Sequence, residues 1–126
     1  MRAVIGGCLV AATLATSPAH GETTMRELEM ILELFDLEQK DGDTGFFLGY
    51  LVGVEAALNV DRKPYCQPTN LVTDAGILRQ AYRLGLSHWK KGDNLQTHKK
   101  DGRAKSTFLL IPYLMLDGFK LLFPCN

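Results

Sequence analysis

The stretch Thr44–Asn59, Thr-Gly-Phe-Phe-Leu-Gly-Tyr-Leu-Val-Gly-Val-Glu-Ala-Ala-Leu-Asn, decides how this chain folds. Small residues recur at every fourth position in it: Gly45, Gly49, Gly53 and Ala57. On an α-helix, residues at this spacing form one ridge. Each glycine inside a helix costs about 1 kcal/mol relative to alanine, so tertiary packing must favour the helix. We therefore predict a mostly enclosed central helix, with the rest of the chain packed on its ridge.

Paired membrane helices carry the same ridge of small residues, so a membrane span is the alternative interpretation. A span needs about 20 apolar residues. Here Asp41 and Asp43 precede the apolar run, and Glu55, Asp61 and Arg62 crowd its end. The pattern favours a helix inside a globular domain.

The first 21 residues have the pattern of a secretory signal. Arg2 supplies a positive start, residues 3–15 form an apolar run, and Ala19-His20-Gly21 offers small residues at a cleavage site. We expect cleavage before Glu22 and a periplasmic location.

Two other interpretations of the leader remain open. Ile5-Gly6-Gly7-Cys8 resembles a lipobox, but few apolar residues precede Cys8. An uncleaved membrane anchor is disfavoured because the run is short and ends in Ser17-Pro18.

Residues 22–126 are predicted to form a single domain. The full chain has 14 basic and 14 acidic residues, and only Arg2 leaves with the leader, so 13 basic residues remain against 14 acidic ones. This balance favours neither nucleic acid nor an acidic membrane as a partner. Acidic residues gather in 22–43 and basic ones in 90–105, which two solvated faces would also explain.

Removal of the leader leaves two cysteines, Cys66 and Cys125. In an oxidising compartment such a pair is predicted to form a disulfide, which would fasten the C-terminus to the middle of the chain. Metal binding is the competing interpretation, but the wide spacing lacks any Cys-x-x-Cys or His-x-x-x-His pattern. We expect no metal and no cofactor.

Capping signals and apolar periodicity predict the other helices. Thr24 and Glu27 form a Thr-x-x-Glu capping box, so the first mature helix should run from Thr24 to about Gln39. The turn at residues 40–43 should fold the Thr44–Asn59 helix back antiparallel. A third helix, capped by Thr73 or Asp74, should reach Lys91 after a proline-containing loop over 60–71.

The last part of the chain is predicted to contain a connection and a final helix. Residues 92–105 have almost no apolar side chain, which predicts a solvated, mobile loop. The final helix should begin near Ser106, with Pro112 starting or kinking it, and is nearly apolar all round. Such a helix is deeply buried or pairs with another copy of the chain. The predicted fold is an all-α bundle of about four to five helices with one disulfide.

No catalytic motif stands out. The mature chain offers His88 and His98, and neither lies beside a recognisable nucleophile signature. His88 falls in a last helical turn, where it is better explained as a capping or surface residue. The absence of a motif favours a binding protein over an enzyme.

Three motifs carry a resemblance to a known family. Gly49–Leu58 reads Gly-Tyr-Leu-Val-Gly-Val-Glu-Ala-Ala-Leu, and it is followed by Cys66-Gln67-Pro68 and by the closing Phe123-Pro124-Cys125. This pattern resembles the Rap/Tai-like immunity proteins of type VI secretion over about residues 34–125. The resemblance implies a small exported α-helical protein, commonly a homodimer, that binds and blocks a peptidoglycan amidase effector.

The chain departs from this family in two places. Members often carry a further cysteine pair, where this chain has Phe35 and Phe47. The connection over 92–105 also exceeds the family pattern by roughly a dozen residues, which fits a partner-specific insertion.

For an immunity protein, the resemblance implies inhibition by steric occlusion of the amidase cleft. The candidate segment is the basic loop, with these residues proposed to meet an acidic rim: His98, Lys99, Lys100 and Arg103. The competing interpretation is that the lysines only keep the protein soluble. Two other function classes stay open, an acid-stress chaperone of the HdeA kind, for which the acidic first helix would be the switch, and an accessory enzyme domain.

Overall fold

The computed structural model describes residues 23–40, 42, 45–59, 64–68, 71–102 and 106–125. These residues form five helices and no strand: α2 (Met25–Gln39), α3 (Phe46–Leu58), α4 (Ala75–Lys91), α5 (Asn94–Lys100) and α6 (Thr107–Leu122). The predicted all-α bundle with one disulfide is confirmed. The predicted leader, Glu22 and Arg103 lie outside the described residues.

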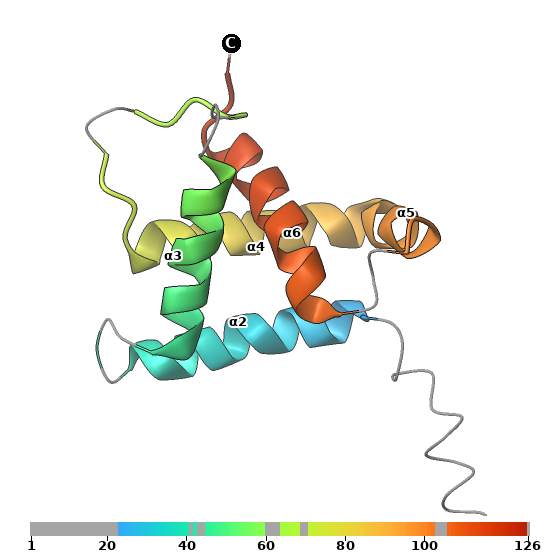
Figure 1. Cartoon of the computed structure of the whole chain (residues 1–126), viewed down its shortest axis with the longest axis horizontal. Helices are drawn as coiled ribbons and strands as arrows, with labels where there is room; N and C mark the ends of the chain where they lie inside the picture. The colour runs from blue at the N-terminus through green and yellow to red at the C-terminus, as the bar shows by residue number, and fades with distance from the viewer. Residues whose placement is uncertain are drawn as a thin grey trace, which may run out of the picture.

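The helices cross in two layers (Figure 1). α3 and α6 are neighbours in one layer and run in the same direction, while α2 and α4 pass across them in the other. α3 turns steeply away from the end of α2, so the predicted antiparallel return of α3 along α2 is wrong. α4 and α6 make the most extensive contact between any two helices.

The start of α2 is as predicted. Thr24 and Glu27 form the complete capping box, in which the Glu27 backbone N–H donates to Thr24 Oγ1 at 3.3 Å and the Thr24 backbone N–H donates to Glu27 Oε1 at 3.2 Å. Thr107, at the start of α6, also donates to Glu27 Oε2 at 3.2 Å. One carboxylate thus helps to hold the first turns of two helices.

The start of α3 is held by α2. The backbone N–H groups of Phe46 and Phe47 donate to the two carboxylate oxygens of Glu38 at 2.7 and 2.9 Å. The first N–H groups of a helix have no partner inside it, and a carboxylate there satisfies them and complements the helix dipole. Gly45 precedes α3 with φ +131°, a conformation that glycine favours, and a side chain there would collide with Glu38.

α4 and α6 approach so closely that backbone touches backbone. A Cβ atom added at Gly118 would overlap the backbone of Ala81, and one added at Gly85 would overlap the carbonyl oxygen of Leu114. Tight contact between these helices therefore requires glycine at both positions. α6 buries six residues in this contact and around it: Leu110, Ile111, Leu114, Met115, Gly118 and Phe119.

The Cys66–Cys125 disulfide joins the loop that follows α3 to the segment that follows α6, as predicted. The Cys66 backbone N–H also donates to the carbonyl oxygen of Phe123 at 2.8 Å. Beside it, the Tyr65 ring stacks on Phe119 with ring centres 4.8 Å apart. The C-terminal segment is therefore held by a covalent bond, a hydrogen bond and a ring contact.

Candidate protein-binding surfaces

The ridge of small residues on α3 faces outward. Gly49, Gly53 and Ala57 are exposed, and a Cβ atom added at Gly49 or Gly53 would meet nothing within 4 Å. The prediction that the rest of the chain packs on this ridge is therefore wrong for the described residues. The reason is that spacing places small residues on one helix face without specifying which face is buried. In this chain α3 buries only Leu51 and Val54.

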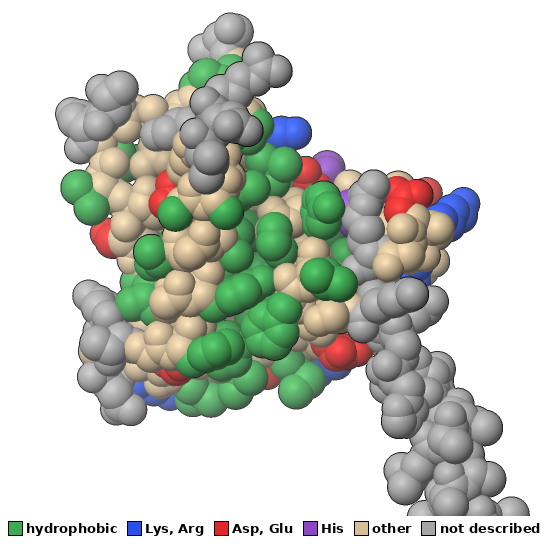
Figure 2. Space-filling model, in the orientation of Figure 1, with side chains coloured by type: hydrophobic (Ala, Val, Ile, Leu, Met, Phe, Trp, Pro, Cys, Tyr) green, Lys and Arg blue, Asp and Glu red, His purple; other side chains and the backbone are tan. Residues whose placement is uncertain are grey.

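The ridge borders an apolar groove between α3 and α6. A volume of about 420 Å³ is lined by Gly49, Tyr50, Gly53, Val54, Ala57, Leu58 and Pro112. Large apolar side chains on these two helices also remain exposed: Phe46, Val52, Phe108, Leu109, Tyr113 and Leu121. Figure 2 shows apolar side chains gathered over this face, with acidic and basic ones mostly toward its edges. Monomeric proteins rarely leave such contiguous apolar surfaces uncovered.

Tyr50 fixes α3 to α6 through a carbonyl group that Pro112 leaves free. Proline lacks an N–H, so Pro112 cannot bond the carbonyl oxygen four residues earlier, which belongs to Phe108. The Tyr50 hydroxyl donates to that oxygen at 2.6 Å, and its ring lies edge-on against the Phe108 ring, with centres 5.0 Å apart. Partial burial raises the pKa of Tyr50, so its hydroxyl keeps its proton and remains a donor.

The connection after α4 contains a short helix. Residues 94–100 form α5, so the prediction of a mobile loop over 92–105 is wrong for this part. Leu95 and His98 are buried, although the sequence predicts that His98 lies in a solvated loop. The His98 ring lies against Trp89, with ring centres 5.0 Å apart, and against Tyr113, with centres 4.8 Å apart. α5 is thus anchored to α4 and α6 by its own side chains.

The predicted partner-binding residues His98, Lys99 and Lys100 follow one another in α5 but differ in burial. His98 points into the protein, Lys99 is half-buried and Lys100 is exposed. Lys90 and Lys91, at the end of α4, are also exposed. The structure therefore leaves Lys91 and Lys100 exposed at the ends of α4 and α5, while His98 anchors α5.

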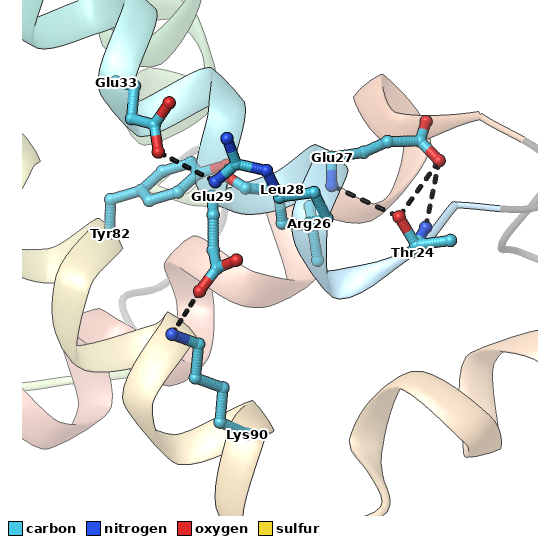
Figure 3. A network of polar contacts seen from close by, with 8 residues as sticks. All are labelled: Thr24, Arg26, Glu27, Leu28, Glu29, Glu33, Tyr82 and Lys90. Atoms are coloured by element: carbon cyan, nitrogen blue, oxygen red, sulfur yellow. Dashed lines mark hydrogen bonds and ion pairs between the residues drawn. The ribbon is translucent and has the colours of Figure 1, made fainter.

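The groove between α2 and α4 is lined by charged side chains together with two leucines. A groove of about 360 Å³ there is lined by Arg26, Glu29, Leu32, Glu33, Asp36, Arg83, Leu86, Ser87 and Lys90. Lys90 pairs with Glu29, and Arg26 pairs with Glu33 at 2.9 Å (Figure 3). The hydrogen bond from Lys90 lowers the pKa of the Glu29 carboxyl. Beneath these pairs, the Tyr82 hydroxyl donates to the Leu28 carbonyl oxygen at 2.7 Å, and burial raises the pKa of Tyr82.

Among the residues that the structure describes, no three or more histidine, cysteine, aspartate or glutamate side chains are grouped so that they could hold a metal ion. None of the helices there combines the length and the apolar character that crossing a membrane requires.

Comparison of the chain with protein-family profiles, with curated proteins and with solved structures gives no match. The likeness to the Rap/Tai-like family thus depends on the short motifs alone.

Sequence reasoning missed two features of these surfaces. The bond between Tyr50 and the Phe108 carbonyl was not predicted, although a proline in a helix interior leaves the carbonyl four residues earlier without its usual N–H partner. The anchoring role of His98 was missed because an isolated histidine and leucine in a polar stretch give too weak a pattern to predict a helix.

Proposed function

We propose that the protein is a periplasmic immunity protein that binds a peptidoglycan amidase effector of type VI secretion and blocks its cleft without turnover. The motifs over Gly49–Leu58, Cys66–Pro68 and Phe123–Cys125 support this function by their resemblance to the Rap/Tai-like family.

The geometry of α5 is the observation that carries occlusion as the mechanism. A blocking segment must protrude and keep its shape, because ordering a mobile loop on binding would reduce affinity. α5 extends beyond the end of α4 (Figure 1), and its buried residues Leu95 and His98 hold it in place. It therefore offers a preorganised projection to a cleft.

The basic residues around α5 give this projection a preferred partner. Lys91 is the last residue of α4 and Lys100 the last residue of α5, and both are exposed. An acidic rim around the amidase cleft would attract them and accelerate association. Since these contacts lie at the edge of an interface, we expect their effect to weaken with salt.

The test begins with the neighbouring open reading frame, which the proposal expects to encode a small peptidoglycan amidase, and continues with titration of that amidase by the mature chain. We expect the mature chain to stop peptidoglycan hydrolysis at stoichiometric amounts. The double variant Lys91→Glu and Lys100→Glu should weaken inhibition about tenfold or more, which corresponds to about 1.4 kcal/mol.

Lys120→Glu is the matched control, because Lys120 is an exposed lysine in the last turn of α6. It should leave inhibition unchanged. Hydrolysis that continues at saturating amounts of the mature chain would refute the proposed function, and equal effects of the two sets of variants would refute the role of α5.

A further inference from the structure

We infer that the groove between α2 and α4 binds a carboxylate, the side chain of a glutamate or aspartate in a segment of a partner protein, and that Arg83 is the residue that binds it. No residue of α5 lines this groove, and the site does not depend on the proposed inhibition of an amidase.

Two ion pairs join α2 to α4, which run in opposite directions along each other (Figure 1). Arg79, near the start of α4, donates to the two carboxylate oxygens of Asp36 at 2.6 and 3.2 Å. Lys90, in the last turn of α4, pairs with Glu29. The groove of about 360 Å³ is lined by residues of both pairs and by residues that lie between them in the two helices.

The charged residues in the middle of the groove do not form a third pair across it. Glu33, which lies between Glu29 and Asp36 on α2, pairs with Arg26 of its own helix at 2.9 Å (Figure 3). Arg83 lines the groove from α4, and among the described residues it makes no ion pair or hydrogen bond. Because every carboxylate that lines the groove has a basic partner, Arg83 supplies the one positive charge left over.

The side chains around Arg83 complete a site for one carboxylate. Ser87, one turn further along α4, lines the same groove, and its hydroxyl has no hydrogen-bond partner among the described residues. A guanidinium binds both oxygens of a carboxylate, and a hydroxyl can donate to one of them. Arg83 and Ser87 are exposed and also line a neighbouring hollow of about 330 Å³, so a ligand can reach both.

A protein segment is the ligand that fits the rest of the groove. A surface ion pair contributes little free energy in water, so a small carboxylate alone would bind poorly. Leu32 and Leu86 line the groove beside the charged groups, and an apolar residue next to the bound carboxylate would gain contact with them. A phosphate group carries about two negative charges. The lining acids Glu29, Glu33 and Asp36 would repel the second charge, because pairing leaves only one positive charge free.

Titration of the mature, disulfide-bonded chain, followed by nuclear magnetic resonance, tests this site. The probe is the capped peptide acetyl-Leu-Glu-Leu-amide, and the matched control peptide has glutamine in place of glutamate. We expect the glutamate peptide to shift the backbone amide signals of residues 83–87 saturably, with a dissociation constant on the order of 1 mM. The glutamine peptide should bind about tenfold more weakly, because it lacks the charge that Arg83 recognises. Arg83→Gln should abolish the difference between the two peptides.

Two further variants change the number of unpaired charges in opposite directions. Glu33→Gln frees Arg26, which adds a second unpaired base and should strengthen binding of the glutamate peptide about threefold. Arg26→Gln frees Glu33, which can then pair with Arg83, so this variant should weaken binding. Lys120→Gln removes an exposed positive charge from α6 and should bind the peptide as the native chain does. The amide spectrum of each variant shows directly whether it is folded.

Three results would overturn the inference. They are equal binding of the two peptides, undiminished binding of the glutamate peptide by folded Arg83→Gln, and the absence of saturable shifts in the native chain. Tighter binding of inorganic phosphate than of the glutamate peptide would assign the groove to a different anion and would also overturn it.

Discussion

α3 and α6 lie side by side, have similar apolar compositions and contain small residues, but they differ in burial. α6 buries six side chains or glycines and touches the backbone of α4. α3 buries two residues and leaves its small residues open. The difference shows that apolar composition alone does not decide which face of a helix is buried, because that depends on which other helices pack against it.

The disulfide links the segment that follows α3 to the segment that follows α6. Its removal should have the largest effect on the free energy of unfolding. Cys66 and Cys125 are 59 residues apart, and release of a loop of that length should lower the free energy of unfolding by about 4 kcal/mol. Urea unfolding of the variant Cys66→Ser with Cys125→Ser checks this value. Reductant should shift the native chain to the same midpoint and leave the variant unchanged. If reductant leaves the urea midpoint of the native chain unchanged, the prediction is wrong.

Alanine at the closely packed glycine should have the next largest effect. Gly118→Ala places a methyl group where the Ala81 backbone lies, so we expect a loss of about 3 kcal/mol in the free energy of unfolding at every protein concentration. Gly49→Ala is the matched control, since its Cβ would meet nothing within 4 Å. In dilute solution the control should stabilise the helix by about 1 kcal/mol. Similar urea midpoints for the two variants would remove the contrast between α3 and α6.

Much of the fold followed from the sequence because local chemistry specified it. The sequence predicts the caps at Thr24 and Asp74 because each depends on residues close to one another in the chain. It predicts the disulfide because two cysteines remain once the leader is removed. The same holds for the limits of α2 and α4.

The sequence did not predict which face of α3 is buried, because that depends on contacts with helices that are distant in the chain. Gly85 and Gly118 are 33 positions apart and show no periodic relation, although they mark the closest helix crossing. The periodic ridge at Gly49 and Gly53 therefore predicts a packing contact inside the chain that the described residues do not make. Of the predicted surface residues, Lys100 is exposed, and His98 is buried by a ring contact that no spacing reveals.

The bond from Tyr50 to α6 tests how firmly α3 is held. Tyr50→Phe removes the donor from the Phe108 carbonyl and should cost about 1 kcal/mol. In a Pro112→Ala background the alanine N–H can bond the same carbonyl, so the cost of Tyr50→Phe should fall. A double-mutant cycle in urea separates this coupling from the loss of the hydroxyl itself. If the effects of Tyr50→Phe and Pro112→Ala on the free energy of unfolding are purely additive, the Phe108 carbonyl has another hydrogen-bond donor in solution.

The smallest effect concerns the charged α2–α4 side, which contrasts with the apolar α3–α6 face. Lys90 lowers the pKa of Glu29 from its ordinary value of 4.5, so the ionised carboxyl binds fewer protons in the folded state than in the unfolded state. The stabilisation is therefore fully present above the ordinary pKa and disappears as the pH falls through the folded value. Glu29→Gln should remove this part of the acid dependence, while the Gly49→Ala variant should retain it. Urea midpoints followed from neutral pH to below 4.5 measure the difference, which should shrink with added salt because the pair is at the surface. An unchanged acid dependence in Glu29→Gln would show that Lys90 does not hold the carboxylate in solution.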